Sequence, residues 1–284
     1  MADGNQNTQM ASQAGTRLRE EEHDRELHEV RAIVEAITRP SRSILRVSAR
    51  LVSSTDDPNW SQPNVAFRIH LGADYGGISR IYTVRDYDGS GCFTFDVVLH
   101  EGESPMMRWT SALAIGDSFE LTGPRPHLGI PEAMGRKVAL FLDETGIPAL
   151  HSLLRQWPAG ITGKGWVATK DAEAFAELPQ IEGLALMRID VQDDAEADVL
   201  LSQAKRMADA AGWAVWGAGE RREMRSIRQH FVGLGLNKQD LAIAGYWRRG
   251  VSNTEIDERR KQDYQRVLAR GGTLADYDDL AVEV

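Results

Sequence analysis

Four side chains suited to ligand binding crowd one short stretch, ISRIYTVRDYDGSGCFTFDVVLHE, at residues 78–101. Arg80 and Arg85 flank the pair Tyr82 and Thr83, and an ordinary surface hairpin does not need them so close together. Because alternate residues of a strand face the same side, we expect Arg80 and Tyr82 to project together. Taken alone, the stretch favours a cross-strand charged pair beside a half-buried tyrosine, since short motifs often give false positives.

Further ligand-binding candidates lie on the next strand and in the turn that follows it. Asp96 and His100 share one face of that strand, opposite to its apolar residues. Arg108 and Trp109 begin a predicted helical turn, whose backbone N–H groups can cradle a pyrophosphate. Two plainer interpretations stay open, with His100 as a solvent-facing residue at a strand end and Trp109 as a core anchor.

The second half of the chain places polar residues directly after predicted strands. Asp143, Glu144 and Thr145 follow the buried strand that begins at residue 137. Open α/β sheets bind ligands at the carboxyl ends of their strands, and glycines there allow a close backbone approach. The acidic residues equally suit helix caps. A second group with the same placement comprises Gly217, Ala218, Gly219 and Glu220.

Cations and aromatic residues gather toward the C-terminal end of the chain. Arg221, Arg225 and Arg228 share one face of a predicted helix, which is either a solvated face or an anion site. The most unusual aromatic element is GYWRRG at residues 245–250. It supplies two aromatic residues followed by two cations, Tyr246, Trp247, Arg248 and Arg249. No persuasive catalytic triad is visible in the sequence.

Two different scaffolds are needed to position these residues. Short alternating runs between residues 41 and 128, separated by Asp-Gly, Gly-Ser-Gly and Pro-rich turns, predict a small antiparallel barrel. From about residue 135 strands and helices alternate, which predicts a parallel α/β sheet.

Helices are predicted at both ends of this arrangement and within its second half. Residues 16–37 carry apolar residues at helical spacing, and Pro40 ends that helix. Residues 195–212 predict an amphipathic helix closed by Gly212. The sequence SNTE is a capping box that begins a last helix, to about Leu268. The predicted parts are a flexible tail and helix over 1–40, the barrel over 41–130, the α/β domain over 135–251, and a helix with an acidic tail over 252–284.

The composition disfavours several classes of protein. The 284 residues, 42% of them hydrophobic, suffice for one large domain or two ordinary ones, and the net charge of -9 disfavours a general nucleic-acid binder. No apolar run is long enough to span a bilayer, and no signal pattern opens the chain, so we expect a cytoplasmic protein without a membrane partner. The single cysteine, Cys92, cannot build a disulfide, a thiolate zinc site or an iron–sulfur cluster within the chain.

An ordered set of motifs resembles the siderophore-interacting proteins, a ferredoxin-reductase-like family of cytoplasmic ferric-siderophore reductases. The motifs are RIYTVRDYD, DVVLHE, RW and GD, GPR, LDETGIPAL, VWGAGERREMRSIRQHF and AGYWRRG. The likeness runs from about residue 41 to residue 250, and an ordered set is far more specific than any single motif. One departure stands out, because SPMMRW puts Met107 where the family has a serine hydroxyl, and a thioether is a poor partner for phosphate.

The resemblance implies a flavin-binding antiparallel β-barrel followed by an NAD(P)H-binding α/β domain. It implies FAD, with FMN not excluded, and either NADPH or NADH. Lys170 lies where a cation favours the 2′-phosphate of NADPH, although a surface lysine is the commoner explanation. The implied flavin contacts are Arg80, Tyr82, Thr83, Arg85, Asp96, His100, Arg108, Trp109, Tyr246 and Trp247. The implied nicotinamide contacts are Asp143, Glu144, Thr145, Lys170, Gly217, Ala218, Gly219 and Glu220, and the implied siderophore contacts are Arg225, Arg248 and Arg249.

The implied function is NAD(P)H-dependent reduction of Fe(III) in a ferric siderophore, which releases Fe(II) in the cytoplasm. The cofactor carries the redox chemistry, so no catalytic side chain is expected, and no protein metal site is needed because iron arrives in its chelator. Two alternatives stay open: a general flavin, quinone or ferredoxin-type reductase of the same fold, and a non-catalytic flavin- or siderophore-binding module, which Met107 favours. The sequence does not identify the siderophore or the oligomeric state.

Overall fold

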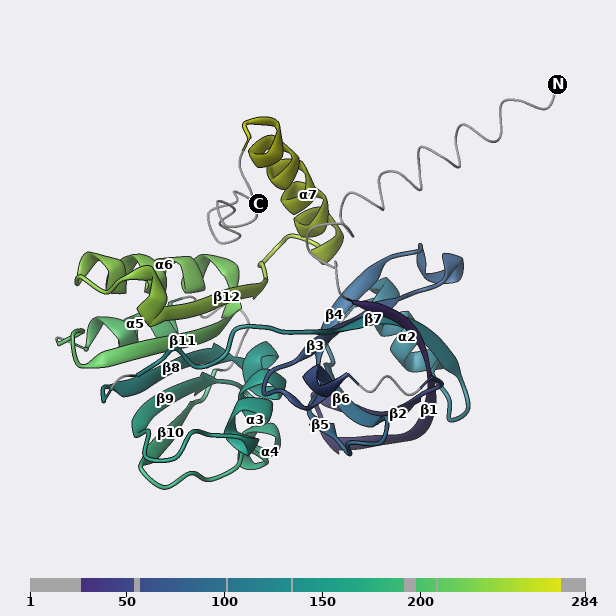
Figure 1. The fold of residues 1–284 in the computed structure, drawn as a ribbon, viewed down its shortest axis with the longest axis horizontal. Helices are drawn as coiled ribbons and strands as arrows, with labels where there is room; N and C mark the ends of the chain where they lie inside the picture. Colours follow the sequence, from purple (N-terminus) through teal and green to yellow (C-terminus); the bar gives the residue numbers. More distant parts are fainter. Residues whose placement is uncertain are drawn as a thin grey trace.

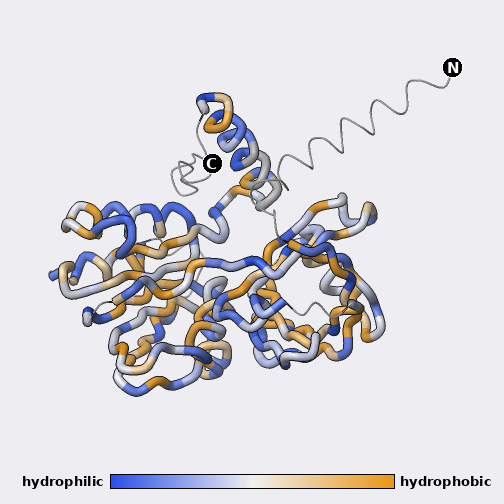
Figure 2. Tube along the Cα trace, in the orientation of Figure 1, coloured by the Kyte–Doolittle hydropathy of each residue, from blue (hydrophilic) through white to orange (hydrophobic). Residues whose placement is uncertain are grey.

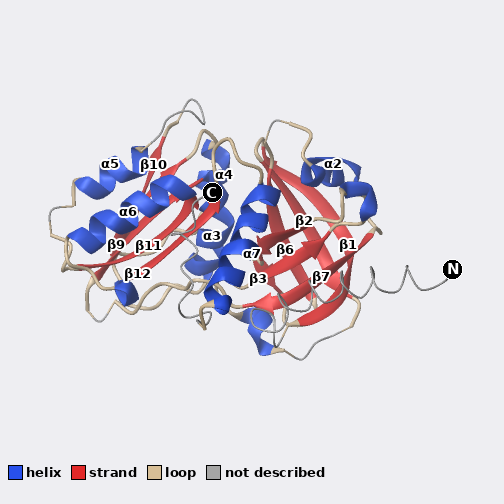
Figure 3. Cartoon of the chain, turned by 90° about the horizontal axis from the view of Figure 1, so that it is seen from above, coloured by secondary structure: helices blue, strands red, loops and turns tan. Residues whose placement is uncertain are grey.

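The chain forms two domains side by side, an antiparallel barrel and a parallel α/β domain, with one helix above their junction (Figures 1 and 3). This structure is a computed structural model that describes residues 27–53, 57–100, 102–133, 135–191, 198–207 and 209–271. No helix in these ranges is long and apolar enough to cross a membrane. The two sheets confirm the predicted fold class.

Seven strands form the barrel sheet, in the order β4-β3-β7-β1-β2-β6-β5 with antiparallel neighbours. After β4 the backbone N–H of Arg85 donates to the Thr94 carbonyl oxygen of β6 at 2.8 Å, which brings the two ends of the sheet together. The strands are β1 (His28–Ser41), β2 (Ile44–Leu51), β3 (Ala66–His70), β4 (Ser79–Thr83), β5 (Asp86–Tyr87), β6 (Cys92–Val98) and β7 (Ser118–Arg125).

Aromatic residues fill the barrel interior. Phe67 of β3 meets Phe93 and Phe95 of β6 edge-on, with ring centroids 5.1 and 5.2 Å apart. Trp60, which is 1% exposed, covers Phe93. Edge-to-face contacts of this kind are favourable beyond the apolar area that they bury, so they fix how the strands of the barrel lie against each other.

The first barrel strand corrects the helix predicted over residues 16–37. Its second half is strand β1, which pairs with β2 and β7, and residues 16–26 lie outside the described part of the chain. Val30, Ala32 and Val34 are buried while the residues between them are exposed, so the stretch also has the two-residue period of a strand. Pairing on both sides and inward packing of this face outweigh the helical spacing.

Five strands form the parallel sheet of the second domain, in the order β10-β9-β8-β11-β12. Strand order reverses between β8 and β11, and the crevice beyond such a point is where open α/β sheets bind ligands. The DETG and GAGE motifs both lie here. The strands are β8 (Lys137–Asp143), β9 (Gly163–Ala168), β10 (Leu184–Ile189), β11 (Trp213–Glu220) and β12 (Leu241–Trp247).

Helices cover both faces of this sheet because β8 is apolar on both sides. Val138, Leu140 and Leu142 pack toward helix α3, while Ala139 and Phe141 pack toward α5 and α6. Figure 2 shows hydrophobic segments along the strands of both domains and a largely hydrophilic α6. The α-helices are α2 (Pro105–Ala112), α3 (Ile147–Arg155), α4 (Ala172–Ala176), α5 (Val199–Lys205), α6 (Arg221–Gly233) and α7 (Asn253–Ala269), and short 3-10 helices span Pro58–Ser61, Ala73–Tyr75, Glu144–Gly146 and Lys238–Asp240.

Two helix predictions have different outcomes. The helix predicted over residues 195–212 ends at Lys205, so Gly212 does not close it but lies in the turn before β11. The last helix begins as predicted, because Ser252 and Glu255 form the capping box of α7. The Arg260 guanidinium donates to the Gly245 carbonyl oxygen at 3.1 Å, which holds α7 against β12 above the domain junction (Figure 1).

A buried carboxylate joins two of these helices. Glu223 of α6 is 9% exposed, and its Oε1 accepts hydrogen bonds from the backbone N–H groups of Leu200 and Leu201 at 2.7 and 3.0 Å. These donors belong to the first turn of α5, which has no side-chain cap of its own. Burial raises the pKa of Glu223 to about 6 from an ordinary 4.5, despite the two hydrogen bonds, which lower it.

We predict that Glu223 makes the free energy of unfolding depend on pH. Its raised pKa gives a contribution that is complete below about pH 4.5 and is lost as the pH rises through 6. Glu223→Gln does not titrate, so its stability relative to wild type should rise by about 2 kcal/mol between pH 4.5 and 7.5. Urea unfolding at both pH values measures this difference, and the exposed Glu29→Gln on β1 is the control. A pH-independent difference for Glu223→Gln would contradict the prediction.

Candidate functional site

One carboxylate ties together the strand ends at the switch point of the parallel sheet. Asp143 Oδ1 accepts from the Thr145 backbone N–H at 2.9 Å and from its hydroxyl at 2.6 Å. Asp143 Oδ2 accepts from the Glu220 backbone N–H and from Trp247 Nε1, both at 2.7 Å. Burial raises the pKa of Asp143, and the hydrogen bonds from Thr145 and Trp247 counteract it in part. Asp143 therefore connects the carboxyl ends of β8, β11 and β12.

Glycines at this edge let the backbone come close to the carboxylate. A Cβ atom on Gly219 would stand 2.5 Å from Asp143 Oδ2, and one on Gly146 would stand 3.0 Å from the Ala218 carbonyl oxygen. Gly217, further down β11, lies equally close to the Phe141 carbonyl oxygen, at 3.1 Å for a built Cβ. The sequence predicted that these glycines allow a close approach of the backbone. In the structure the close approach is between neighbouring strands and turns of the protein itself.

The acidic residues of this edge also cap helices, as the plainer interpretation predicted. Glu220 Oε2 accepts from the Arg222 and Glu223 backbone N–H groups at 2.7 and 2.9 Å and so begins α6. Glu220 Oε1 accepts from the Arg249 backbone N–H at 3.3 Å. Glu144 extends the edge to the neighbouring strand, because its Oε2 accepts from the Thr169 hydroxyl at 2.6 Å.

The predicted cations divide between the edge of the sheet and the helix beyond it. Arg248 and Arg249 follow Trp247 directly, and Arg249 is exposed whereas Arg248 is half-buried. On α6, Arg221 is buried at 3% exposure. The other two cations of that face, Arg225 and Arg228, are half-buried. The face is therefore not fully solvated, and the anion-site interpretation stays a prediction.

The barrel presents β4 as an edge strand of its sheet. Arg80, Tyr82 and Thr83 are half-buried, while Ile81 between them is 42% exposed. The Tyr82 ring packs against Phe67 and Phe95, with centroids 6.4 and 5.6 Å apart, and burial raises the pKa of Tyr82. One row of β4 backbone groups pairs with β3 and the other faces outward, and α3 contacts this strand.

Helix α2 contains Arg108 and Trp109, which were predicted to bind phosphate or to anchor the barrel core. Ser104 is the N-cap residue, and its hydroxyl accepts from the Met107 backbone N–H at 3.2 Å. Met107 itself belongs to the barrel core at 8% exposure. Arg108 is exposed and stands over the Tyr75 ring at 6.0 Å, while Trp109 meets Phe119 edge-on at 5.8 Å and is 8% exposed, as a core anchor would be.

Two other predicted flavin contacts take part in the domain junction or lie outside it. The Tyr246 ring, at the end of β12, meets His127 of the interdomain connection with centroids 5.8 Å apart. Burial raises the pKa of Tyr246. His100 lies after the end of β6 and is exposed, so its position agrees with the plainer interpretation of a strand-end residue.

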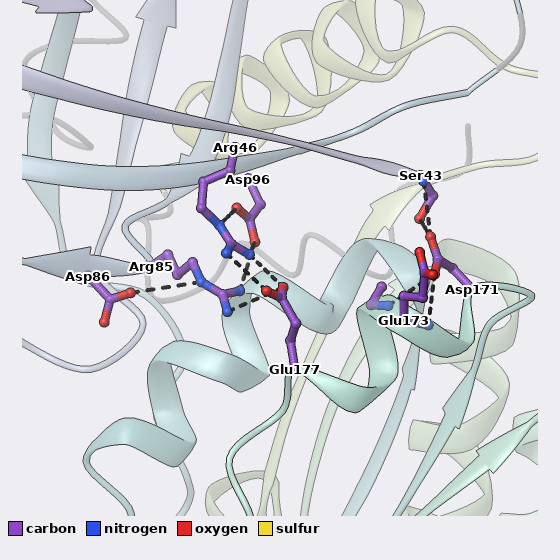
Figure 4. A network of polar contacts seen from close by, with 9 residues as sticks. Ser43, Arg46, Arg85, Asp86, Asp96, Asp171, Glu173 and Glu177 are labelled. Carbon is purple, nitrogen blue, oxygen red and sulfur yellow. Dashed lines mark hydrogen bonds and ion pairs between the residues drawn. The ribbon is translucent and has the colours of Figure 1, made fainter. Parts of the chain in front are cut away.

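Arg85 and Asp96 belong to a polar cluster that spans the two domains (Figure 4). Asp96 is 3% exposed and accepts from Arg85 Nη1 at 2.8 Å and from Arg46 Nε at 2.7 Å. Arg46 Nη2 also donates to Glu177 Oε2 at 2.7 Å, and this bond lowers the pKa of Glu177. Sequence analysis missed Arg46 and Glu177, because alternation places a charged residue on a strand face but does not name its partner from another domain.

Lys170, predicted near the nicotinamide cofactor, follows β9 and is exposed. Its carbonyl oxygen accepts from Arg42 Nη2 of the barrel at 2.7 Å. The structure thus brings together the residues of DETG, GAGE and the tryptophan of GYW, and it places Lys170 two residues beyond the same edge. Within the described ranges, no group of three or more His, Cys, Asp and Glu side chains could hold a metal ion.

The residues on β4 fit the chemistry of a flavin dinucleotide. Arg80 supplies a guanidinium for phosphate, the outward row of backbone groups on β4 can hydrogen-bond a flat polar ring, and Tyr82 supplies an aromatic flank. The barrel, the parallel sheet and their order along the chain are those of the ferredoxin-reductase-like proteins.

The chain belongs to the siderophore-interacting protein family. Family models match at residues 54–128, described as the siderophore-interacting FAD-binding domain, and at 135–250, described as siderophore-interacting protein. The chain is 35% identical to the ferric acinetobactin reductase of Acinetobacter baumannii over 94% of each chain. It is 24% identical to the NADPH-dependent ferric-chelate reductase of Escherichia coli, over 54% of this chain and 59% of that one.

A solved structure of a siderophore-interacting protein from the same Acinetobacter species superposes with a TM-score of 0.81 at 32% identity, covering 86% of this chain and 99% of the other. Together with the curated reductase, this likeness identifies the protein as an oxidoreductase with an FAD-binding domain. The family resemblance seen in the ordered motifs is thereby confirmed.

We predict that Gly219→Ala disturbs the hydrogen bonds around Asp143. The new Cβ would stand 2.5 Å from Asp143 Oδ2, so the carboxylate must shift away from the Glu220 N–H and from Trp247 Nε1. Leaving buried donors without an acceptor should lower the free energy of unfolding by about 1–3 kcal/mol.

Denaturant unfolding followed by tryptophan fluorescence measures this loss. Gly233→Ala on α6 is the matched control, because a Cβ there meets nothing within 4 Å and should leave stability unchanged or raise it slightly. Equal stability of Gly219→Ala and Gly233→Ala would show that the close approach is unimportant.

Proposed function

We propose that the protein is an NAD(P)H-dependent flavin reductase that acts on ferric siderophores and releases Fe(II) in the cytoplasm. The observation that carries the proposal is the juxtaposition of the flavin-compatible strand β4 with α3, the helix that follows DETG at the switch point. Two cofactors that must meet face to face would bind where these two elements meet. The named reductase relatives support the same class of reaction.

The barrel would hold FAD through the residues on and around β4. Arg80 binds phosphate, Tyr82 and Thr83 flank the ring system, and Arg108 at the exposed start of α2 offers a second cation. When bound, FAD supplies the redox chemistry, accepting a hydride and returning electrons singly to Fe(III). Met107 is buried in the barrel core, so the phosphates would have to be bound by the backbone and cations of this region without the hydroxyl that the family has here.

The nicotinamide cofactor would approach the edge that Asp143 organises. Thr145 and the backbone of residues 217–220 line this edge, and Asp143 holds them in place rather than reacting. Lys170 beyond β9 would favour the 2′-phosphate of NADPH over NADH. The NADPH-dependent relative agrees with this preference.

Cations at the end of β12 would gather the anionic ferric siderophore. Arg248 and Arg249 follow Trp247 at the carboxyl end of β12, and half-buried Arg225 lies on α6, which contacts β12. Local cations raise the concentration of an anionic substrate even on an acidic protein. Fe(II) binds hard oxygen ligands less tightly than Fe(III), so reduction releases the metal and leaves the chelator intact.

The general reductase of the same fold is the second candidate, since β4 and Asp143 serve any electron acceptor equally well. Anaerobic mixing of flavin-loaded protein with NADPH or NADH, a ferric siderophore and ferrozine distinguishes the two. We expect flavin bleaching and trapped Fe(II), with faster turnover on ferric siderophore than on quinone or ferredoxin. Bleaching without trapped Fe(II) would favour the general reductase, and no bleaching would count against both.

We predict that Arg80→Ala weakens FAD binding about tenfold to a hundredfold, because a charge-assisted hydrogen bond to phosphate is lost. Titration of cofactor-free protein with FAD, followed by flavin fluorescence, measures the dissociation constant. Arg31→Ala is the control, because Arg31 pairs with Glu120 at 2.7 Å on exposed barrel strands. Equal affinities for the two variants would remove Arg80 from the flavin site.

A further inference from the structure

Helix α4 of the second domain is held by the barrel at both of its ends (Figure 4). At the first end, the N-cap residue Asp171 is 2% exposed and accepts from the Ser43 backbone N–H at 3.0 Å and from its hydroxyl at 2.6 Å. The same carboxylate accepts from the Glu173 and Ala174 backbone N–H groups, both at 3.0 Å. Burial alone would raise the pKa of Asp171, but these hydrogen bonds, led by that of Ser43, lower it to about 2.

At the other end, the C-cap residue Glu177 completes a cluster of four charges. Arg46 donates to Glu177 at 2.7 and 3.1 Å, and Arg85 Nη2 lies 3.5 Å from its Oε2. Asp96 sits between the two arginines on the barrel side. Asp86 of the barrel also lies 3.8 Å from Arg85 Nε, but its side chain is 46% exposed, so solvent screens this pair. Glu177 is therefore the second carboxylate, beside Asp96, that contacts both arginines. Removing its charge leaves the two guanidinium groups with less compensation at the junction.

The position of α4 along the chain links this contact to the nucleotide edge. Its N-cap directly follows Thr169 and Lys170, and the Thr169 hydroxyl donates to Glu144 of the DETG turn at 2.6 Å. Arg42, the neighbour of Ser43, donates to the Lys170 carbonyl oxygen at 2.7 Å. Barrel residues thus grip the segment that leads from the carboxyl end of β9 into α4.

We infer that α4 is a clamp that fixes the nicotinamide edge of the parallel sheet relative to the flavin strand, with Glu177 as a positioning residue for hydride transfer. Domains joined by a single connection move relative to one another unless their interface resists it. Hydride transfer is sensitive to such movement, because reacting atoms must stay within about 3–3.5 Å. Electron transfer from the flavin to the iron chelate tolerates a longer and more variable separation than hydride transfer. This half-reaction therefore depends less on the clamp, although Arg248 and Arg249 of the second domain would gather the chelate.

The inference rests on the proposed function. It predicts different effects on the two half-reactions, which are reduction of the flavin by NADPH and its reoxidation by a ferric siderophore. Glu177→Gln keeps the shape of the side chain but removes its charge. We expect stopped-flow reduction of the bound flavin by NADPH to slow by about tenfold or more. Reoxidation of dithionite-reduced protein by a ferric siderophore should stay within about twofold of wild type, since the variant leaves Arg248 and Arg249 unchanged and single-electron transfer tolerates small movements of the domains. Glu120→Gln, which breaks the exposed Arg31–Glu120 pair between β1 and β7, is the matched control and should change neither rate.

A second variant acts on the opposite end of the same helix. Ser43→Ala removes the hydroxyl, which is one of the two donors that Ser43 offers to Asp171, and should also slow flavin reduction. Because both changes loosen one clamp, the double variant should slow reduction by less than the product of the single effects. Independent, multiplying effects would show that the two ends do not act together.

Hydrogen exchange of the cofactor-free protein tests the clamp without any turnover. Backbone amides of residues 169–177 should exchange faster in Glu177→Gln and in Ser43→Ala, and at the wild-type rate in Glu120→Gln. Unchanged exchange overturns the clamp. Faster exchange with equal slowing of both half-reactions, or with no slowing, overturns the positioning role. A wild-type flavin that neither NADPH nor NADH reduces overturns the proposed function and with it that role, while the exchange experiment still decides the clamp.

Discussion

The junction of the two domains depends on a buried carboxylate that cannot stand alone. Asp96 is 3% exposed, and removing an ion from water is costly unless its partners are well placed. Arg46 and Arg85 both donate to it within 2.8 Å. Two guanidinium cations then face one carboxylate, so their positive charge needs a further anion. Burial lowers the pKa of Arg85, and Asp96 opposes this effect. Asp86 of the barrel compensates Arg85 in part, and Glu177 of the second domain contacts both arginines, so the barrel wall and α4 are joined by ion pairs.

The second constraint lies inside the parallel sheet, where the buried carboxylate of Asp143 accepts hydrogen bonds from neutral donors. Four donors converge on its two oxygens, two from the turn after β8, one from β11 and one from β12. Three strand ends are therefore held in register exactly where the strand order reverses. Because Asp143 already accepts four hydrogen bonds from the chain, it positions the strand ends at this edge, and under the proposed function the cofactor would be bound by the groups around it.

Much of this arrangement follows from local sequence patterns, and the rest depends on partners that are far apart in the chain. Alternation predicted most barrel strands, and strands followed by glycines predicted the ligand-binding edge. The stretch beginning at His28 satisfies both helical and strand periods, and only the pairing of β1 with β2 and β7 decides between them. Glu177 carries no local signal at all, because a carboxylate after a short helix looks like any solvated residue until Arg46 is placed beside it.

The net charge of the protein does not oppose the anionic substrate proposed for it. The net charge of -9 is spread over the whole chain, but salt screens exposed charges beyond about 8 Å at physiological ionic strength. The potential at the edge that Asp143 organises is therefore set by the nearest few groups. Trp247 is tied to Asp143, so the two cations that follow it, Arg248 and Arg249, stand at a fixed place beside the edge. Barrel cations such as Arg46 and Arg85 are neutralised within the junction and add little there. Arginines therefore have two roles under the proposed function: those paired with Asp96 connect the two domains, and Arg248 and Arg249 would attract the anionic chelate.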